Sequence, residues 1–255
     1  KLVVDIALDS AVLNDTARMA ALDTSTQKAY EFSQQQHLFM MESATKKSFI
    51  PPANQREEVL LMRVSGLQDP SLLALVAQTE TFSIYSPDIA IDQKTFLGPL
   101  GPSSTSKYRF NIEDTLYQGS DSVYVISYRP KKGAKFNALK GLLYIHTAGY
   151  AVQNVTAEPV EREGASVRFQ QLHERVDGKW FPRQLNTFIY FDKGNVSVNG
   201  LAPEGVGRIY LRDIEVDAEV DRKEVRGPEF VADRMEIRRD DAYWTTTLAG
   251  LLKNP

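Results

Sequence analysis

The side chains of this 255-residue chain that could do chemistry are three histidines and a row of carboxylates. His37, His146 and His173 form no HExxH motif and no close pair, so the ligand spacing of a zinc hydrolase is missing. Cysteine is absent, and so is any G-x-S-x-G elbow, Walker loop or dinucleotide fingerprint. We therefore expect no metal and no cofactor, and we interpret His146 and His173 as structural, hydrogen-bonded histidines.

Acidic residues alternate with other residues near the end of the chain, at Asp213, Glu215, Asp217, Glu219 and Asp221. On a regular strand this spacing would put all five carboxylates on one face. Glycoside hydrolysis needs only two carboxylates about 5 to 9.5 Å apart, so a carboxylate-dependent hydrolase is one hypothesis. A row of like charges is also typical of the solvated side of an edge strand, where it deters edge pairing. We favour that second interpretation and predict no catalytic residue.

Charge and hydropathy exclude further classes of protein. The chain has 33 acidic and 30 basic residues, a net charge of -3, which argues against a nucleic-acid-binding face. The longest apolar stretches, such as 72–77, are far shorter than the roughly 20 residues of a membrane-spanning helix. The chain begins within a strand-like pattern and ends after an apolar turn of helix, so we expect a piece of a longer protein.

From residue 107 to residue 217 the sequence repeats one theme. Runs rich in Tyr, Phe, Val and Ile alternate in polarity and are divided by turn residues, which indicates strands. Short links without helices predict an antiparallel meander, and Asp177-Gly178 predicts a type I′ hairpin turn. The predicted strands are Tyr108–Leu116, Ser122–Arg129, Leu139–His146, Tyr150–Glu158, Ser166–Val176, Lys179–Phe191 and Arg208–Val216.

The N-terminal part is more varied. Helix formers and capping residues predict helices at 15–31 and 70–78. Residues 36–49 are typical of a strand, residues 58–64 fit either a strand or a helix, and the Gly- and Pro-rich stretch within 89–106 predicts a loop.

These elements predict an α+β fold that is mostly β. Seven or more strands must curl or find a cover, and the two N-terminal helices are the available covers. We therefore expect a curved antiparallel meander sheet, a half-open barrel, wrapped around short helices. Residues 1–220 would form this single domain. Residues 221–255 would form a C-terminal arm or linker, because 221–241 holds six basic and seven acidic side chains of mixed order.

Large apolar side chains are concentrated on the predicted strands. They fill a simple core or, alternatively, line a cavity for an acyl chain or a lipidated peptide. The candidate cavity residues are Tyr108, Phe110, Tyr124, Tyr128, Leu143, Ile145, Phe169, Trp180 and Phe188.

Two motifs resemble a known superfamily. They are the hairpin 141–155, of the pattern G-x-(hydrophobic)-x-I followed by Tyr-Ala-(hydrophobic), and the G-x-W-x-P turn within 176–182. Together they resemble the LolA/LolB-like lipoprotein carriers, which are open barrels that shield acyl chains. Over residues 38–192 the closer likeness is to an uncharacterised family of bacterial outer-membrane proteins. Full-length members of that family combine a carboxypeptidase-regulatory-like domain at the N-terminus, this region and an outer-membrane barrel.

The resemblance implies a periplasmic location, association with an outer-membrane β-barrel and a concave apolar face without catalytic residues. We therefore expect a noncatalytic periplasmic module that binds an acyl chain, a lipid, a lipoprotein or a partner chain on its concave sheet. The flanking domains of a longer chain are expected partners, and nucleic acid is not. A purely structural spacer or docking domain is the alternative, and a carboxylate hydrolase is the third hypothesis.

Overall fold

The computed structural model describes residues 2–8, 24, 27, 39–50, 54–66, 82–91, 94–161, 165–191, 203–223, 225 and 230–231. Strands predominate in this part of the chain, as predicted. The predicted helix 70–78 lies outside the described residues. So does the predicted helix 15–31 except for Thr24 and Gln27, which are both helical.

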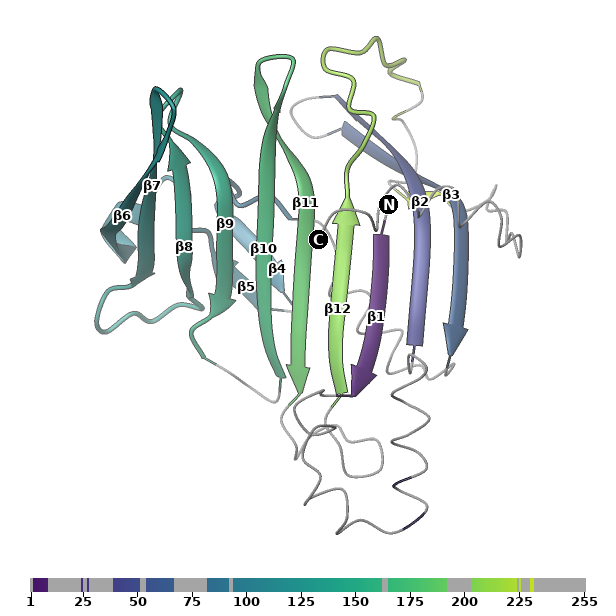
Figure 1. Cartoon of the computed structure of the whole chain (residues 1–255), viewed down its shortest axis with the longest axis horizontal. Helices are drawn as coiled ribbons and strands as arrows, with labels where there is room; N and C mark the ends of the chain where they lie inside the picture. Colours follow the sequence, from purple (N-terminus) through teal and green to yellow (C-terminus); the bar gives the residue numbers. More distant parts are fainter. Residues whose placement is uncertain are drawn as a thin grey trace. The chain divides into compact units, whose positions relative to one another are not determined.

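A seven-strand antiparallel meander forms the main sheet, in which each strand pairs with the next along the chain (Figure 1). This arrangement confirms the predicted meander. The strand β1 (Leu2–Leu8) adds to the sheet beside β12, also antiparallel. The meander strands are β6 (Tyr108–Gln118), β7 (Asp121–Pro130), β8 (Leu139–His146), β9 (Ala151–Pro159), β10 (Ala165–Val176), β11 (Lys179–Phe191) and β12 (Pro203–Tyr210).

The turn between β10 and β11 is the one that the sequence predicts. Asp177 and Gly178 have φ values of 48° and 80°, so both central residues are left-handed, as a type I′ turn requires. Glycine also matters where two strands approach closely. A Cβ on Gly141 would lie 1.9 Å from the Thr156 carbonyl oxygen and 3.0 Å from the Tyr128 hydroxyl, which crosses this position to donate to that same carbonyl.

The last predicted strand is shifted. β12 ends at Tyr210, whereas the polarity pattern predicts a strand over 208–216. The backbone explains the difference: β11 continues to Lys179 beyond its last paired residue, Gln184 opposite Tyr210, but Asp213 has a φ value of 51°, which an extended strand does not accommodate.

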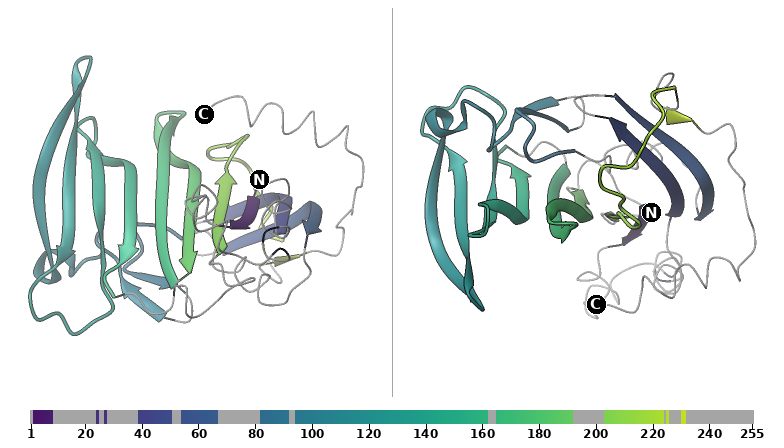
Figure 2. Two further views of the ribbon diagram at one scale, coloured as in Figure 1. Left: turned by 60° about the horizontal axis from the view of Figure 1, so that its bottom comes forward. Right: turned by 90° about the horizontal axis from the view of Figure 1, so that it is seen from above.

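A two-stranded hairpin lies on one face of the main sheet (Figure 2). It consists of β4 (Asp88–Ile91) and β5 (Lys94–Leu97), and a four-residue helix, α5 (Ser104–Lys107), precedes β6. The prediction of a loop over 89–106 is therefore wrong at its start. Among the described residues, no helix is long and apolar enough to cross a membrane.

By its internal contacts the chain separates into two compact units. The first comprises Lys1–Met40 and Gly66–Val216, and it contains the meander and the hairpin. The second comprises Met41–Ser65 and Asp217–Pro255.

The second unit holds most of β2 (Phe39–Ile50), β3 (Asn54–Gly66) and β13 (Phe230–Val231). In it β3 lies between β2 and β13, and β13 pairs parallel with β3. The strand predicted at 36–49 is confirmed over residues 39–49, its first three residues lie outside the described ones, and residues 58–64 are a strand. The predicted division into 1–220 and 221–255 stays a prediction.

Candidate functional site

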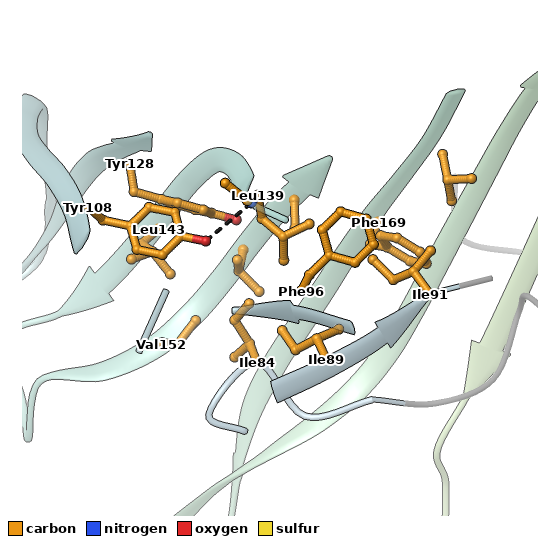
Figure 3. Close-up of a cluster of buried hydrophobic side chains, with 14 of the residues drawn as sticks. Ile84, Ile89, Ile91, Phe96, Tyr108, Tyr128, Leu139, Leu143, Val152 and Phe169 are labelled. Atoms are coloured by element: carbon orange, nitrogen blue, oxygen red, sulfur yellow. Dashed lines mark hydrogen bonds between the residues drawn. The ribbon is translucent and has the colours of Figure 1, made fainter. Parts of the chain in front are cut away.

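One face of the main sheet carries the apolar core of the first unit. The side chains that meet there come from β6 to β11 and from the segment 82–97, so the hairpin β4–β5 lies against the sheet (Figure 3). From the hairpin side, Ile84, Ile89, Ile91 and Phe96 are all at most 7% exposed. The ring of Phe82 meets that of Phe169 edge-on, with a centroid distance of 5.0 Å. The chain thus covers its own apolar face.

The structure brings six of the nine candidate cavity residues together in this core. Tyr108, Tyr128, Leu143 and Phe169 are at most 3% exposed within the core cluster. Phe110 and Ile145 are partly buried and pack against the cluster. These six side chains fill space instead of lining a large cavity.

The other three candidates do not belong to this cluster. Tyr124 lies opposite Ile145 in the β7–β8 ladder but is only partly buried. Trp180 contacts His146, with a ring centroid distance of 5.3 Å. Phe188 is adjacent to the core residue Ile189 on β11, so its side chain lies on the opposite face of the sheet.

Two buried tyrosines donate hydrogen bonds in this core, and the bond from Tyr108 joins the hairpin to the sheet. The Tyr108 hydroxyl donates to the Leu97 carbonyl at 2.6 Å and accepts from the Leu139 N–H at 3.2 Å. The Tyr128 hydroxyl donates to the Thr156 carbonyl at 2.9 Å. Burial raises the pKa of Tyr108 and of Tyr128, so both hydroxyls stay protonated and able to donate.

Further polar contacts hold the segment that enters the hairpin. The Gln171 side chain donates to the Phe82 carbonyl at 2.7 Å, and the Val152 N–H donates to the Tyr85 hydroxyl at 3.0 Å. At the other end, the Asn137 side chain donates to the Thr95 carbonyl at 3.0 Å. Hydrogen bonds therefore hold the segment 82–97 near both of its ends.

Beside the hairpin there is a small depression. Its volume is about 90 Å³, and its lining includes Lys94, Phe96, Phe136 and Val160. Small-molecule sites in proteins are usually about 300–1,000 Å³. In this state the depression cannot hold a long acyl chain.

The two described histidines have structural surroundings. The Nδ1 atom of His146 accepts a hydrogen bond from the Ala148 N–H at 3.1 Å, as predicted for a structural histidine. His173 is 8% exposed and lies edge-on to Tyr85, and its Nδ1 atom has no hydrogen-bond partner. Burial lowers the pKa of His173. Within the described ranges, no three His, Asp or Glu side chains are placed to hold a metal ion.

The prediction that the acidic row shares one face of a strand is wrong. Residues 211–221 follow β12 without forming a strand, and all five carboxylates of the row are exposed. Asp213 and Asp217 have φ values of 51° and 58°, which breaks the pleat that the prediction requires. The row gives no support to a paired-carboxylate hydrolase.

Residue-based reasoning missed the outer edge of β6. In the described part of the chain no strand pairs with this edge. Large apolar side chains are nevertheless exposed on the strand: Ile112 is 67% exposed, Leu116 40% and Tyr117 83%. The polarity pattern shows that Ile112 shares a face with Phe110, but only the strand order shows that β6 is an edge.

Charged residues on β6 lie among these exposed apolar side chains. Arg109 is directly opposite Arg129 of β7, and both are exposed. The ladder shifts register between Ile112 and Asp114, so Glu113 has no residue opposite it on β7. The Glu113 carboxylate instead accepts a hydrogen bond from the Ser127 hydroxyl.

Comparison with known proteins identifies the family. A family model described as a family of unknown function, DUF5686, matches residues 11–202. The chain belongs to the DUF5686 family. The match covers the hairpin and the meander strands β6 to β11, so the covered face and the β6 edge both lie in the part that defines the family. No curated protein and no solved structure matches the chain.

Proposed function

We propose that this DUF5686 chain is a noncatalytic docking module, and that it receives an extended strand of a protein partner on the outer edge of β6. The observation that carries the proposal is a contrast within one sheet. The apolar face is covered by the chain's own hairpin, whereas the β6 edge exposes Ile112, Leu116 and Tyr117.

An edge strand presents unpaired backbone N–H and C=O groups that only another extended chain satisfies in full. Soluble proteins usually protect such an edge with charges, with proline or by covering it. β6 contains no proline, and its charged residues Arg109, Glu113 and Asp114 flank an exposed isoleucine instead of replacing it. Apolar side chains on an open edge are the features that strand addition uses for affinity and specificity.

A defined peptide tests this docking edge. The probe is a synthetic peptide with the sequence of residues 121–130, which is the strand that β6 already pairs with on its inner side. Its control carries proline in place of Val125 and Ser127, because proline removes backbone donors. We expect the peptide to slow hydrogen exchange at β6 amides and the proline control to have no effect.

Two variants locate the effect. Ile112→Lys should abolish the protection by the peptide, whereas Tyr150→Lys should preserve it, because Tyr150 is 74% exposed but lies in the β8–β9 turn. If millimolar peptide left the exchange of β6 unchanged, the proposal of a docking edge would be overturned.

The second candidate function is binding of an acyl chain or lipid on the face now under the hairpin. This candidate is favoured because β4 and β5 form a separate two-stranded sheet. The hairpin can therefore move away from the apolar face without breaking the strand pairing of the main sheet. A fluorescent probe, 1-anilinonaphthalene-8-sulfonate, would then bind saturably and be displaced by palmitate, with faster exchange at residues 82–97. Absence of saturable binding would contradict this candidate.

We further propose a periplasmic location beside the outer membrane, supported by the resemblance of the hairpin and turn motifs to lipoprotein carriers. The chain has no cysteine, so a Tyr117→Cys variant carries a single thiol. In the bacterium that encodes it, a membrane-impermeant maleimide should label this thiol once the outer membrane alone is opened. Labelling only after lysis of the inner membrane would contradict this location.

A further inference from the structure

We propose that the strand received by β6 is β6 of a second copy of this chain, paired antiparallel about a two-fold axis at Asn111. The inference rests on the proposed docking edge and names its partner. In this register Arg109 of each copy lies opposite Glu113 of the other, and Phe110 lies opposite Ile112. The two main sheets would then join into one continuous sheet.

The charges of β6 favour this register. Arg109 faces Arg129 inside the chain, and like charges directly opposite each other on a sheet are destabilising. Among the described residues neither arginine forms an ion pair that would relieve this repulsion. A carboxylate from a second copy, arriving on the outer side of Arg109, would supply the missing opposite charge.

The face on which Glu113 lies fits this role. Arg109 and Asn111 are two residues apart on β6 and therefore share a face, and Ser127 of β7 lies opposite Asn111. Because the Glu113 carboxylate accepts a hydrogen bond from the Ser127 hydroxyl, it lies on that same face. The register shift after Ile112 thus places Glu113 where Arg109 of a second copy would meet it.

The apolar residues of β6 give the same result on the other face. Phe110 is half-buried and packs against the core cluster, with its ring 6.3 Å from that of Tyr108. Ile112 on the same face is 67% exposed. Pairing about Asn111 sets each Ile112 beside the Phe110 of the other copy, so the most exposed aliphatic side chain of the strand joins an existing aromatic cluster.

Antiparallel registers with the axis at one of the next three residues are poorer. An axis at Glu113 or at Asp114 would set that carboxylate against its own copy, and an axis at Ile112 would set Phe110 opposite Asp114. The axis at Asn111 sets an uncharged side chain against itself. It also brings two pairs of opposite charges together, because the symmetry repeats each contact.

A disulfide test reads the register directly, because the chain contains no cysteine. In antiparallel pairs, residues that lie opposite each other have Cα atoms about 4.5 or 5.5 Å apart, and a disulfide bridges either distance. We expect Asn111→Cys to form a covalent dimer under mild oxidation. Arg109→Cys alone should form no disulfide-linked dimer, because its Cα atoms would lie roughly 14 Å apart at about 3.4 Å per residue.

A charge-swap series tests the same contact without cross-linking. We expect sedimentation equilibrium to show a reversible dimer of the unmodified chain at micromolar concentrations. Arg109→Glu should weaken the dimer at least tenfold, and Arg109→Glu combined with Glu113→Arg should restore it. Ile112→Lys should also weaken the dimer at least tenfold, whereas Tyr150→Lys should leave it unchanged.

The outcomes separate this inference from the docking function on which it rests. A monomer at 100 µM, or cross-linking of Arg109→Cys as efficient as that of Asn111→Cys, would overturn the self-pairing. If the chain is monomeric while the 121–130 peptide still protects β6, the docking edge stands and its partner is a different protein. If neither the peptide nor a second copy protects β6, both proposals fail.

Discussion

The two ends of β6 both carry a tyrosine, but in opposite surroundings. Tyr108 at the start of the strand is 1% exposed, and Tyr117 near its end is 83% exposed. The difference arises from what lies against each end. The Tyr108 hydroxyl reaches the last residue of the hairpin, whereas the edge beyond Ile112 has no neighbour in the described part of the chain.

This contrast shows that the most apolar face of the sheet and its most exposed apolar surface are different regions. The face with the most apolar side chains is closed by the hairpin, and its polar groups are largely paired. The exposed apolar surface lies instead on a strand edge with unpaired backbone, where a partner gains both hydrogen bonds and apolar contact. Stability should therefore depend on the first region and association on the second.

The largest expected effect is on the covered face. Phe169 is 3% exposed and meets Phe82 edge-on, so Phe169→Ala removes a buried ring that joins the sheet to the segment entering the hairpin. We expect a loss of about 3–5 kcal/mol in the free energy of unfolding, measured by urea titration. Tyr117→Ala is the control on the same sheet and should cost less than about 0.5 kcal/mol. Equal losses for the two variants would remove the distinction between the two regions.

A smaller effect is expected where a single hydroxyl joins hairpin and sheet. Tyr108→Phe leaves the Leu97 carbonyl and the Leu139 N–H without their partner, while the ring still packs. We expect a loss of about 2 kcal/mol, together with faster hydrogen exchange at β5.

Tyr128→Phe is the matched control, because that hydroxyl bonds to the Thr156 carbonyl of β9 and not to the hairpin. It should lower stability without a specific change at β5. If hydrogen exchange at β5 rose equally in the two variants, the Tyr108 hydroxyl would not be the group that holds the hairpin to the sheet.

Particular residues show which parts of the fold follow from the sequence pattern and which do not. Alternation and turn chemistry suffice for the meander, since each strand pairs with its immediate neighbour and Asp177-Gly178 dictates its own turn. They fail at Asp213, because its φ value of 51° takes the backbone out of the extended conformation, which the alternation of residue types does not reveal. They also miss the hairpin β4–β5. Ile89 and Ile91 have the alternate spacing of a strand, but the Gly and Pro residues that follow them dominate the composition and predict a loop.

The candidate site shows the same limit. Six of the nine cavity candidates do meet, so strand alternation was enough to find the apolar face. Whether that face is open depends on the position of the segment 82–97, and whether Ile112 is exposed depends on β6 being the last strand. Both facts follow from long-range pairing, which local patterns do not encode.

Lowering the pH should destabilise the apolar face under the hairpin before it affects the outer edge of β6. Burial lowers the pKa of His173 below its ordinary value of 6.5, so below that pH the unfolded chain takes up the proton more readily than the folded one. The stability contributed by neutral His173 is therefore present above pH 6.5. It is lost as the pH falls from there to the pKa of the folded state.

The measurement is the urea midpoint of unfolding between pH 7.5 and pH 5, for the unmodified chain and for His173→Gln. We expect the unmodified chain to lose more stability over this range than the variant, by less than the loss caused by Tyr108→Phe. Because Tyr85 lies against His173, hydrogen exchange at residues 82–85 should rise with the loss. Parallel pH curves for the two proteins would show that His173 does not contribute.

The smallest effect on stability should accompany a large effect on association. Ile112 is 67% exposed, so Ile112→Lys loses little buried area in the isolated chain and should change the free energy of unfolding by no more than about 0.5 kcal/mol. This must be measured at a concentration where the chain is monomeric, because a dimer would add stability by mass action.

The same substitution, Ile112→Lys, should weaken pairing at β6 at least tenfold, since the lysine replaces the apolar contact with Phe110 of a second copy. Phe169→Ala, assayed below its unfolding midpoint, should do the reverse and leave pairing unchanged. If Ile112→Lys instead destabilised the monomer as strongly as Phe169→Ala, β6 would be part of the core, and the exposed edge would carry no separate function.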